Sequence, residues 1–260
     1  MSDTSLSTMD YDIFEGMTSI SAVINSIIRG SSNRTIVKIL FDKSRARQKA
    51  RELKFLEHAS KDLSFELIPS EHFAIDELCS GNTHGGFVAI CTKRHFSALN
   101  VNFLTNGNFF ALIDGIEDPY NFGYSVRSLY AAGVDGIVLP ERNWMEFSGT
   151  VARSSAGTSE LASICFSDSL NAAVFFKQNG FEIVCAGIRN SVPFYEHDFS
   201  KPTLLIVGGE KRGISSKLLD ISDATVRIEY GREFMGSLPT SSAVSVIAFE
   251  ISRQKMQKST

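Results

Sequence analysis

Cysteine and long apolar runs are scarce in this sequence. The four cysteines are Cys79, Cys91, Cys165 and Cys185. They form no C-x-x-C pair and have no histidine at metal-ligand spacing. We expect small buried side chains or free thiols, with no disulfide and no metal. No apolar stretch approaches the roughly 20 residues that cross a bilayer. The first residues are polar and acidic and show no secretory signal, so a cytoplasmic protein is expected.

Positive charge is not in excess either. The 260 residues carry a net charge of −3, which argues against a surface coated with basic residues for non-specific nucleic-acid binding. Hydrophobic residues make up 43% and charged residues 21%, which is ordinary for a soluble globular protein. The length allows one large domain or two modest ones, each with its own core.

The first third of the chain alternates helical and strand patterns. Residues 1–17 are expected to be a loosely ordered lead-in, and residues 94–107 a linker. Between them, residues 18–93 are expected to form a small α/β domain. His84-Gly85-Gly86 is expected to form a turn, and a ligand-facing histidine is the alternative. Its expected helices are 19–30, 44–59 and 70–79, and its expected strands are 35–41, 63–68 and 87–91.

The same alternation recurs over residues 108–260, which are expected to form a second domain. The alternating order of strands and helices implies a mostly parallel sheet covered on both faces. The expected strands are 109–113, 136–139, 161–165, 181–186, 203–207 and 224–229. The expected helices are 121–132, about 145–154, 168–179, 215–220 and a long C-terminal helix.

Basic residues cluster locally in spite of the negative net charge. They are Lys43, Arg45, Arg47, Lys49, Arg51 and Lys54. Cations gathered on one element raise nucleic-acid affinity electrostatically, so one interpretation is a patch that binds RNA phosphates. The alternative is the solvated face of a helix.

Residues 109–133 are predicted to form a strand, a tight turn and a helix. Asn121 is predicted to cap the helix, and Gly133 to end it in a left-handed conformation. Gly123 and Arg127 share a helix face, and helical side chains lean toward the N-terminus. Arg127 is therefore expected to point toward the carboxyl end of the strand, where ligands bind in open α/β sheets. The alternative for Arg127 is a salt bridge on an amphipathic helix.

Two further loops follow strand patterns. The loop Gly208 to Gly213 comes after an apolar strand, and its three glycines allow a ligand to approach the main chain closely. It lacks the G-K-[ST] ending of a P-loop and the G-x-G-x-x-G pattern, and a plain connector is the alternative. After the last strand, Pro239 suits the first position of a helix. That helix is expected to be buried, because one face carries Ala243, Ile247 and Ile251.

These three loops together resemble the signature motifs of the SpoU/TrmH family of RNA ribose 2′-O-methyltransferases. The matches are residues 118–133 for the first motif, 206–214 for the second and 237–250 for the third. Arg153-Ser154-Ser155-Ala156-Gly157 is similar to the family's Ser-Ala-Gly helix. The first domain looks like the ribosomal-protein-like RNA-binding domain often fused in front.

The resemblance implies a fold and an activity. The fold would be a C-terminal α/β trefoil-knot domain with a mostly parallel sheet, preceded by a small α/β ribosomal-protein-like RNA-binding domain. The knot would form a pocket for S-adenosylmethionine, and a homodimer would place the active site at its interface. The reaction would move a methyl group from S-adenosylmethionine to a ribose 2′-hydroxyl of ribosomal or transfer RNA.

Site residues also follow from the resemblance. Arg127 would reach the RNA ribose or its phosphate, while Asn121 and Glu210 would brace the motif loops. The implied catalytic residues are Arg127, Asn121, Glu210 and Ser237. The implied cofactor-binding residues are Gly208, Gly209, Ile228, Leu238 and Ser241. Arg153 joins the six clustered cations as an RNA-binding residue.

The third motif departs from the family pattern. The family has Asn where this chain has Pro239, and Ile-Pro-Met where it has Ile228-Glu229-Tyr230, with one extra residue between the two points. Proline has no side-chain amide and no backbone N–H, so any hydrogen bond of the family's Asn is lost. The alternative is therefore a catalytically weak or inactive RNA-binding dimeric relative that keeps the knot fold.

Overall fold

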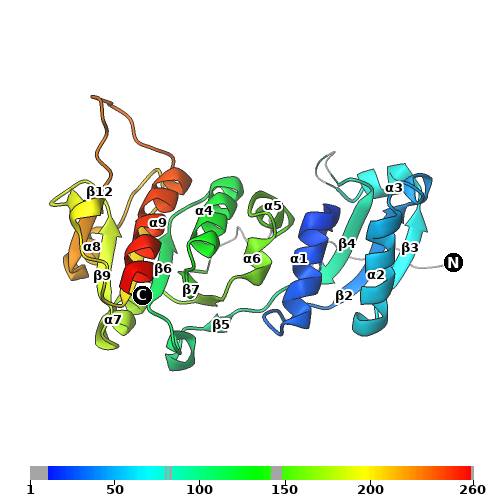
Figure 1. Ribbon diagram of the computed structural model, residues 1–260, viewed down its shortest axis with the longest axis horizontal. Helices are drawn as coiled ribbons and strands as arrows, with labels where there is room; N and C mark the ends of the chain where they lie inside the picture. The colour runs from blue at the N-terminus through cyan, green and yellow to red at the C-terminus, as the bar shows by residue number, and fades with distance from the viewer. Residues whose placement is uncertain (1–10, 80, 82–83, 142–147, 259–260) are drawn as a thin grey trace. The chain divides into compact units, whose positions relative to one another are not determined.

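The computed structural model describes residues 11–79, 81, 84–141 and 148–258. Contacts divide the chain into two compact units, and Figure 1 labels many of their elements. The first unit contains Met1–His95 and Met145–Leu161, and the second contains Phe96–Trp144 and Ala162–Thr260. Within the described ranges, no helix has both the length and the apolar character needed to span a membrane.

A four-stranded mixed sheet with the order β1-β4-β2-β3 forms the base of the first unit. Strand β4 is antiparallel to β1 and β2, whereas β3 runs parallel to β2. The core contains the buried side chains of Phe14, Ile20, Ile39 and Leu56. The elements are β1 (Tyr11–Glu15), α1 (Gly16–Ile28), β2 (Ile36–Asp42), α2 (Ala50–Leu63), β3 (Glu66–Ser70), α3 (His72–Asp76), β4 (Phe87–Thr92), α5 (Ser148–Ser154) and α6 (Thr158–Leu161).

Two sequence-based expectations for this unit are wrong. Strand β1 lies where a loosely ordered lead-in is expected. Its Asp12 is buried because it pairs with Arg34, and a polar residue on the buried side breaks the apolar alternation by which a strand is predicted. The expected helix 44–59 begins only at Ala50. A 3-10 turn, Lys43–Arg45, precedes it and is capped by Asp42, whose carboxylate accepts from the backbone N–H of Ser44 over 2.9 Å. Much of the basic cluster therefore lies ahead of α2.

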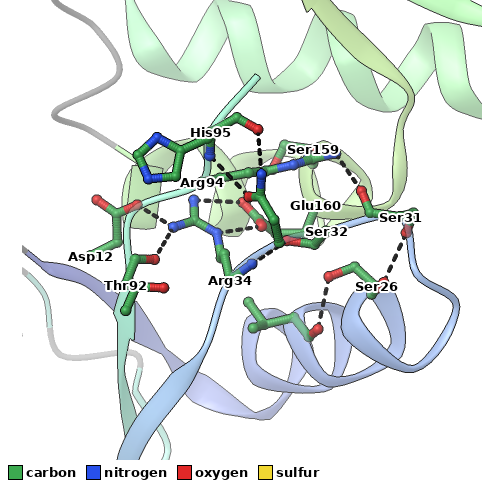
Figure 2. Close-up of polar contacts among 12 residues, drawn as sticks. Asp12, Ser26, Ser31, Ser32, Arg34, Thr92, Arg94, His95, Ser159 and Glu160 are labelled. Carbon is green, nitrogen blue, oxygen red and sulfur yellow. Dashed lines mark hydrogen bonds and ion pairs between the residues drawn. The ribbon is translucent and has the colours of Figure 1, made fainter. Parts of the chain in front are cut away.

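Buried ion pairs hold α6 in the first unit. Arg34 donates to Glu160 over 2.8 Å and to Asp12 over 2.5 Å, as Figure 2 shows. Arg94 donates to the backbone carbonyl of Ser159 over 2.8 Å. A buried charge left unpaired is costly, so these contacts fix the position of α6 within this unit. The segment with α5 and α6 thus packs in the first unit, although in the sequence it stands between two strands of the second.

The second unit has an eight-stranded sheet with the order β10-β12-β9-β11-β6-β7-β8-β5. All neighbouring strands in it are parallel, which confirms the expected parallel α/β sheet. The elements are β5 (Ser97–Ala98), β6 (Phe109–Asp114), α4 (Pro119–Ala131), β7 (Gly136–Leu139), β8 (Ile164–Phe166), α7 (Ser169–Gln178), β9 (Glu182–Ala186), β10 (Val192–Pro193), β11 (Thr203–Gly208), α8 (Ser216–Ile221), β12 (Ala224–Arg227) and α9 (Thr240–Lys258).

Strands β6 and β11 lie side by side in the middle of this sheet and are almost wholly buried. Both are continuous apolar runs, as expected for parallel strands covered on both faces. Phe110 of β6 packs against Phe176 and Phe181 with ring centroids 5.1 and 5.4 Å apart. Because Asp114 stands opposite Gly208 in the register, the loops that follow the two strands begin at the same point of the sheet edge.

Some expected elements of the second domain differ from the structure. Residues 158–161 are helical and β8 begins at Ile164, so the expected strand 161–165 is wrong at its start. The reason is that the pattern of a short apolar run does not distinguish a strand from the end of a helix. The expected linker contains β5, which pairs with β8. The helix expected at about 145–154 corresponds to α5 from Ser148, and residues 145–147 lie outside the described ranges. The implied trefoil knot stays a prediction.

Candidate active site

Asp118 organises the loop between β6 and α4. Its carboxylate accepts from the backbone N–H groups of Tyr120 over 3.2 Å and Asn121 over 3.3 Å, and Pro119 takes the first helical position. The expectation that Asn121 caps α4 is therefore wrong, because Asp118 does so. Gly133 has φ +80°, as predicted for the residue that ends the helix. The side chain of Asn121 is left available for another contact.

That contact joins the first loop to the second. The Asn121 Nδ2 atom donates to Glu210 Oε1 over 2.7 Å. A second link is the ion pair between Lys211 Nζ and Glu117 Oε2, at 2.8 Å. The structure thus brings together Asn121 and Glu210, the two residues expected to brace the motif loops.

The glycines of the second loop pack main chain against main chain. A Cβ atom at Gly208 would lie 2.3 Å from the carbonyl carbon of Gly213. One at Gly209 would lie 1.8 Å from the carbonyl oxygen of Gly115, which itself has φ +88°. No side chain fits at positions 208 and 209 without displacing this backbone. The loops after β6 and β11 therefore meet through backbone atoms.

Arg127 lies on the exposed side of α4. It forms no salt bridge within the described ranges, so the alternative role on an amphipathic helix is not seen there. Arginine presents a fork of N–H donors that matches carboxylate and phosphate oxygens. The guanidinium of Arg127 is exposed to solvent.

Glu229 begins the stretch that departs from the family pattern. Its carboxylate accepts from the Tyr195 hydroxyl over 2.5 Å and from Arg227 Nη2 over 2.6 Å. The hydrogen bond from Tyr195, followed by that from Arg227, lowers the pKa of the Glu229 carboxyl. The negative charge is thus balanced locally. Sequence reasoning missed Tyr195, because no motif connects it to a residue 34 positions later.

Tyr230 closes the third loop on itself. Its hydroxyl accepts from the backbone N–H of Leu238 over 3.0 Å, and its ring lies 5.6 Å from that of Phe234. Pro239 stands one residue before α9, and its carbonyl accepts from the N–H of Ala243 over 3.1 Å. Ser237 is exposed, while Ile228, Leu238 and Ser241 are half-buried.

Helices α4 and α9 pack side by side (Figure 1). The hydroxyl groups of Ser128 on α4 and Ser245 on α9 lie 2.6 Å apart. Ile247 and Ile251 are buried, which confirms the expected burial of one face of the C-terminal helix. The first and third motifs are therefore in contact through their helices.

The basic cluster of the first unit is mostly exposed. Its exposed members are Lys43, Arg45, Arg47, Arg51 and Lys54. Some cations have acidic partners: Lys43 pairs with Glu71, and Arg45 lies 3.3 Å from Asp42. Lys49 is half-buried and pairs with Glu52 at 2.9 Å. Arg153 pairs with Glu15 at 2.5 Å.

One group of side chains has the composition of a metal site. His72, Asp76 and His84 offer ligand atoms within 4.8 Å of one another. However, His84 Nδ1 accepts from the backbone N–H of Gly86 over 3.1 Å, so in the neutral ring the hydrogen is on Nε2, which lies 2.8 Å from Asp76. That nitrogen then has no lone pair for a metal. His84 instead fixes a turn, as the sequence predicts.

The four cysteines carry free thiols, as expected. Burial raises the pKa of Cys79, Cys91 and Cys165 to about 12, and that of Cys185 to about 11. A protonated thiol is a poor nucleophile and a poor metal ligand. These residues therefore pack rather than react.

Curated relatives share part of this chain. It is 31% identical over 145 residues to a protein of Staphylococcus saprophyticus assigned to the TrmH family of tRNA/rRNA methyltransferases. The match covers 55% of this chain and 58% of that relative, so the chain spans little more than half the length of the relative it matches.

Solved structures share the fold over nearly the whole chain. An AdoMet-bound rRNA methyltransferase from Sinorhizobium meliloti has a TM-score of 0.78 at 19% identity, with 94% of this chain and 88% of that chain covered. The SpoU methyltransferase AviRb from Streptomyces viridochromogenes, in complex with AdoMet, has a TM-score of 0.73 at 21% identity, with 95% and 91% covered. At these identities the likeness shows the fold.

A family model shows which family the chain belongs to. Residues 108–249 match the model of the SpoU rRNA Methylase family, and they include Asn121, Arg127, the loop Gly208 to Gly213 and the start of α9. Since this is more than half of the 260 residues, the chain belongs to the SpoU rRNA Methylase family.

Proposed function

We propose that this protein transfers a methyl group from S-adenosylmethionine to a ribose 2′-hydroxyl of ribosomal or transfer RNA. The observation that carries the proposal is the junction after β6 and β11, where Asn121 and Glu210 link two loops and no side chain fits at Gly208 or Gly209. Ligands of open α/β sheets bind at the carboxyl ends of the strands, which is where this junction lies. The family, and the activities named for its members, support the same reaction.

The loops suit a cofactor recognised through main-chain groups. Gly208 and Gly209 leave no room for side chains, so only amide and carbonyl groups face a ligand there. We assign cofactor binding to Gly208, Gly209, Ile228, Leu238 and Ser241. The Leu238 N–H is held by Tyr230 and must be released before it can donate to a ligand. S-adenosylmethionine, when bound, supplies an electrophilic methyl group on a sulfonium.

Arg127 is proposed to orient the RNA. A guanidinium keeps its proton in proteins, so it is unsuited to take the proton of a ribose hydroxyl. It would instead hold the ribose or its phosphate so that the 2′-oxygen faces the methyl group. Orientation of this kind contributes roughly 7–11 kcal/mol in favourable cases. The hydroxyl proton would pass to a phosphate oxygen or to water.

Asn121, Glu210 and Ser237 complete the proposed catalytic set. The first two keep the loops in register through their hydrogen bond. Ser237 is exposed two residues before Pro239, so its hydroxyl can donate where the family's Asn is missing.

Binding of the RNA chain is assigned to the first part of the protein. We take residues 18–93 as the RNA-binding domain, 94–107 as the linker and 108–260 as the methyltransferase domain. The proposed phosphate-binding cations are Lys43, Arg45, Arg47, Lys49, Arg51, Lys54 and Arg153. Phosphate contacts position nucleic acid and make its affinity depend on salt.

A homodimer belongs to the proposal. On the adjacent helices α4 and α9, Tyr120 and Tyr124 are each 46% exposed, and Phe249 is 51% exposed. Exposed apolar groups on neighbouring helices mark interaction surfaces when they form one patch. Light scattering of the full chain is expected to give twice the mass of one chain, and a monomer would contradict this part.

Pro239 favours a second candidate, an RNA-binding relative without activity. It has no N–H and no amide, so a donor that the family pattern supplies is absent at this position. Such a protein would keep the fold and the dimer but not the chemistry.

Two measurements separate the candidates. Calorimetric titration with S-adenosylmethionine is expected to show binding of the cofactor. In the second measurement, the protein is expected to transfer tritiated methyl groups to total RNA from a strain that lacks the protein. Mapping the labelled nucleotide would then identify the substrate. Absence of binding at millimolar cofactor would support the inactive relative and refute the enzyme.

A further inference from the structure

We propose that a cavity at the N-terminus of α1 binds one phosphate group of the RNA backbone. The cavity has a volume of about 360 Å³. Residues 15–19 line it, together with Lys49, Glu52, His84 and Arg153. The proposal deepens the RNA binding proposed above and rests on it. It adds a defined seat and a residue, Ser19, that no motif indicates.

The helix end supplies the first set of donors. Helix α1 has 13 residues, and the first backbone N–H groups of a helix have no partner within it. The residue before the helix, Glu15, makes no side-chain hydrogen bond to them. These N–H groups and the helix dipole favour an anion at this end.

Ser19 is the independent sign of a ligand. It is 1% exposed and lines the cavity, yet its hydroxyl has no hydrogen-bond partner in the described part of the chain. Buried helical serines usually donate to a carbonyl three or four residues earlier. Ser26 on the same helix and Ser154 on α5 both do so. A phosphate oxygen in the cavity would accept a hydrogen bond from this hydroxyl.

The charges around the cavity leave donors for an anion. The two acidic residues of the wall are already paired: Glu15 with Arg153 at 2.5 Å, and Glu52 with Lys49 at 2.9 Å. A guanidinium has five N–H donors and an ammonium three, so both cations keep donors after these contacts. His84 uses both ring nitrogens in its contacts with Gly86 and Asp76 and serves only as wall.

A phosphate suits this lining better than a base. Donors converge on the cavity from a helix end, a hydroxyl, a lysine and an arginine, which is how proteins hold phosphate oxygens. Lys49 and Arg153 stand 104 positions apart, by the difference of their numbers, yet both line this one cavity. Two of the cations proposed to bind RNA, which come from separate segments of the chain, thus line the same cavity.

The test compares two serine variants of the full chain. S19A removes the unpartnered hydroxyl, and the matched control S26A removes a buried hydroxyl of the same helix that does not line the cavity. We expect S19A to weaken binding of unfractionated transfer RNA roughly threefold to tenfold, with an unchanged salt slope, since the hydroxyl is neutral. S26A should bind as the wild type does. Equal affinities for S19A and wild type, or equal losses for S19A and S26A, would overturn the proposal.

Lysine variants test the charged part of the seat. K49Q is expected to lower the salt slope of transfer-RNA binding by about 1, whereas K61Q, which removes the same charge from the end of α2 outside the cavity, leaves the slope unchanged. Equal slopes for the two variants would count against the seat.

Inorganic phosphate separates the two sources of this chemistry. At constant ionic strength, phosphate should raise the Tm of the wild type and of S26A but not that of S19A. A phosphate effect without any loss of RNA binding in S19A would assign the cavity to free phosphate and refute the RNA contact. None of these measurements needs S-adenosylmethionine, so failure of the methyl-transfer reaction and failure of this seat are distinguishable.

Discussion

Asn121 and Glu210 stand 89 residues apart in the sequence, yet the amide of one donates to the carboxylate of the other over 2.7 Å. The cause is the pairing of β6 with β11, in which Asp114 lies opposite Gly208, so that the loops after both strands start together. The hydrogen bond therefore reports whether the two loops are assembled.

Removal of that bond should loosen the cofactor site. N121A is expected to weaken S-adenosylmethionine binding up to about tenfold, since a hydrogen bond to a charged group is worth about 1.5 kcal/mol or less at an exposed position. E210Q keeps a carbonyl acceptor for Asn121 and should bind within about twofold of the wild type. Calorimetric titration measures both. Equal affinity of N121A and wild type would mean that the loops hold without this contact.

Arg127 is expected to act on the RNA and not on the cofactor. R127A should lower methyl transfer about tenfold or more, because misplacement of the reacting oxygen is costly, while cofactor affinity stays near that of the wild type. The exposed position predicts little change in stability. R127K keeps the charge without the planar fork and should retain part of the activity. An unchanged rate in R127A would remove Arg127 from the proposed site.

Glycine 209 provides a steric test of the junction. A Cβ atom there would lie 1.8 Å from the carbonyl oxygen of Gly115, so G209A must displace the backbone of one loop. We expect a lower Tm and loss of S-adenosylmethionine binding. G231A is the matched control, because a Cβ at Gly231 meets nothing within 4 Å. Normal cofactor binding by G209A would show that the loops adapt.

Periodicity and loop chemistry were enough to predict the parallel sheet and its motif loops. The apolar runs of β6 and β11 are unambiguous, and Gly133 ends α4 as its position suggests. The prediction that Asn121 caps α4 is wrong, because Asp118 and Asn121 are both good cap residues and only the backbone decides between them.

Long-range polar partners could not be predicted. Asp12 is buried in β1 only because Arg34 neutralises it, so a polar residue conceals a strand. Glu229 looks like an unexplained charge until Tyr195 and Arg227 are seen to hold it. These pairs depend on tertiary contacts that one sequence does not display.

The buried cluster around Arg34 should be strongly coupled. R34Q leaves Asp12 and Glu160 buried without their cation, and removing one partner of a buried pair costs about 3–5 kcal/mol of unfolding free energy. Replacing all three with leucine should recover much of that loss, because it also removes the unpaired charges. Urea denaturation of the full chain, followed by circular dichroism, measures both. Equal destabilisation by the single and triple changes would argue against charge as the cause.

Tyr230 should compete with the cofactor for one donor. Its hydroxyl holds the Leu238 N–H over 3.0 Å, and that N–H belongs to the proposed cofactor site. Y230F removes the competitor and keeps the ring that packs on Phe234, so S-adenosylmethionine should bind up to about tenfold more tightly. Y195F removes another hydroxyl near this loop without freeing Leu238 and should give no such gain. If Y230F binds more weakly than the wild type, the hydroxyl supports the binding loop instead of occupying it, and Leu238 is not a cofactor ligand.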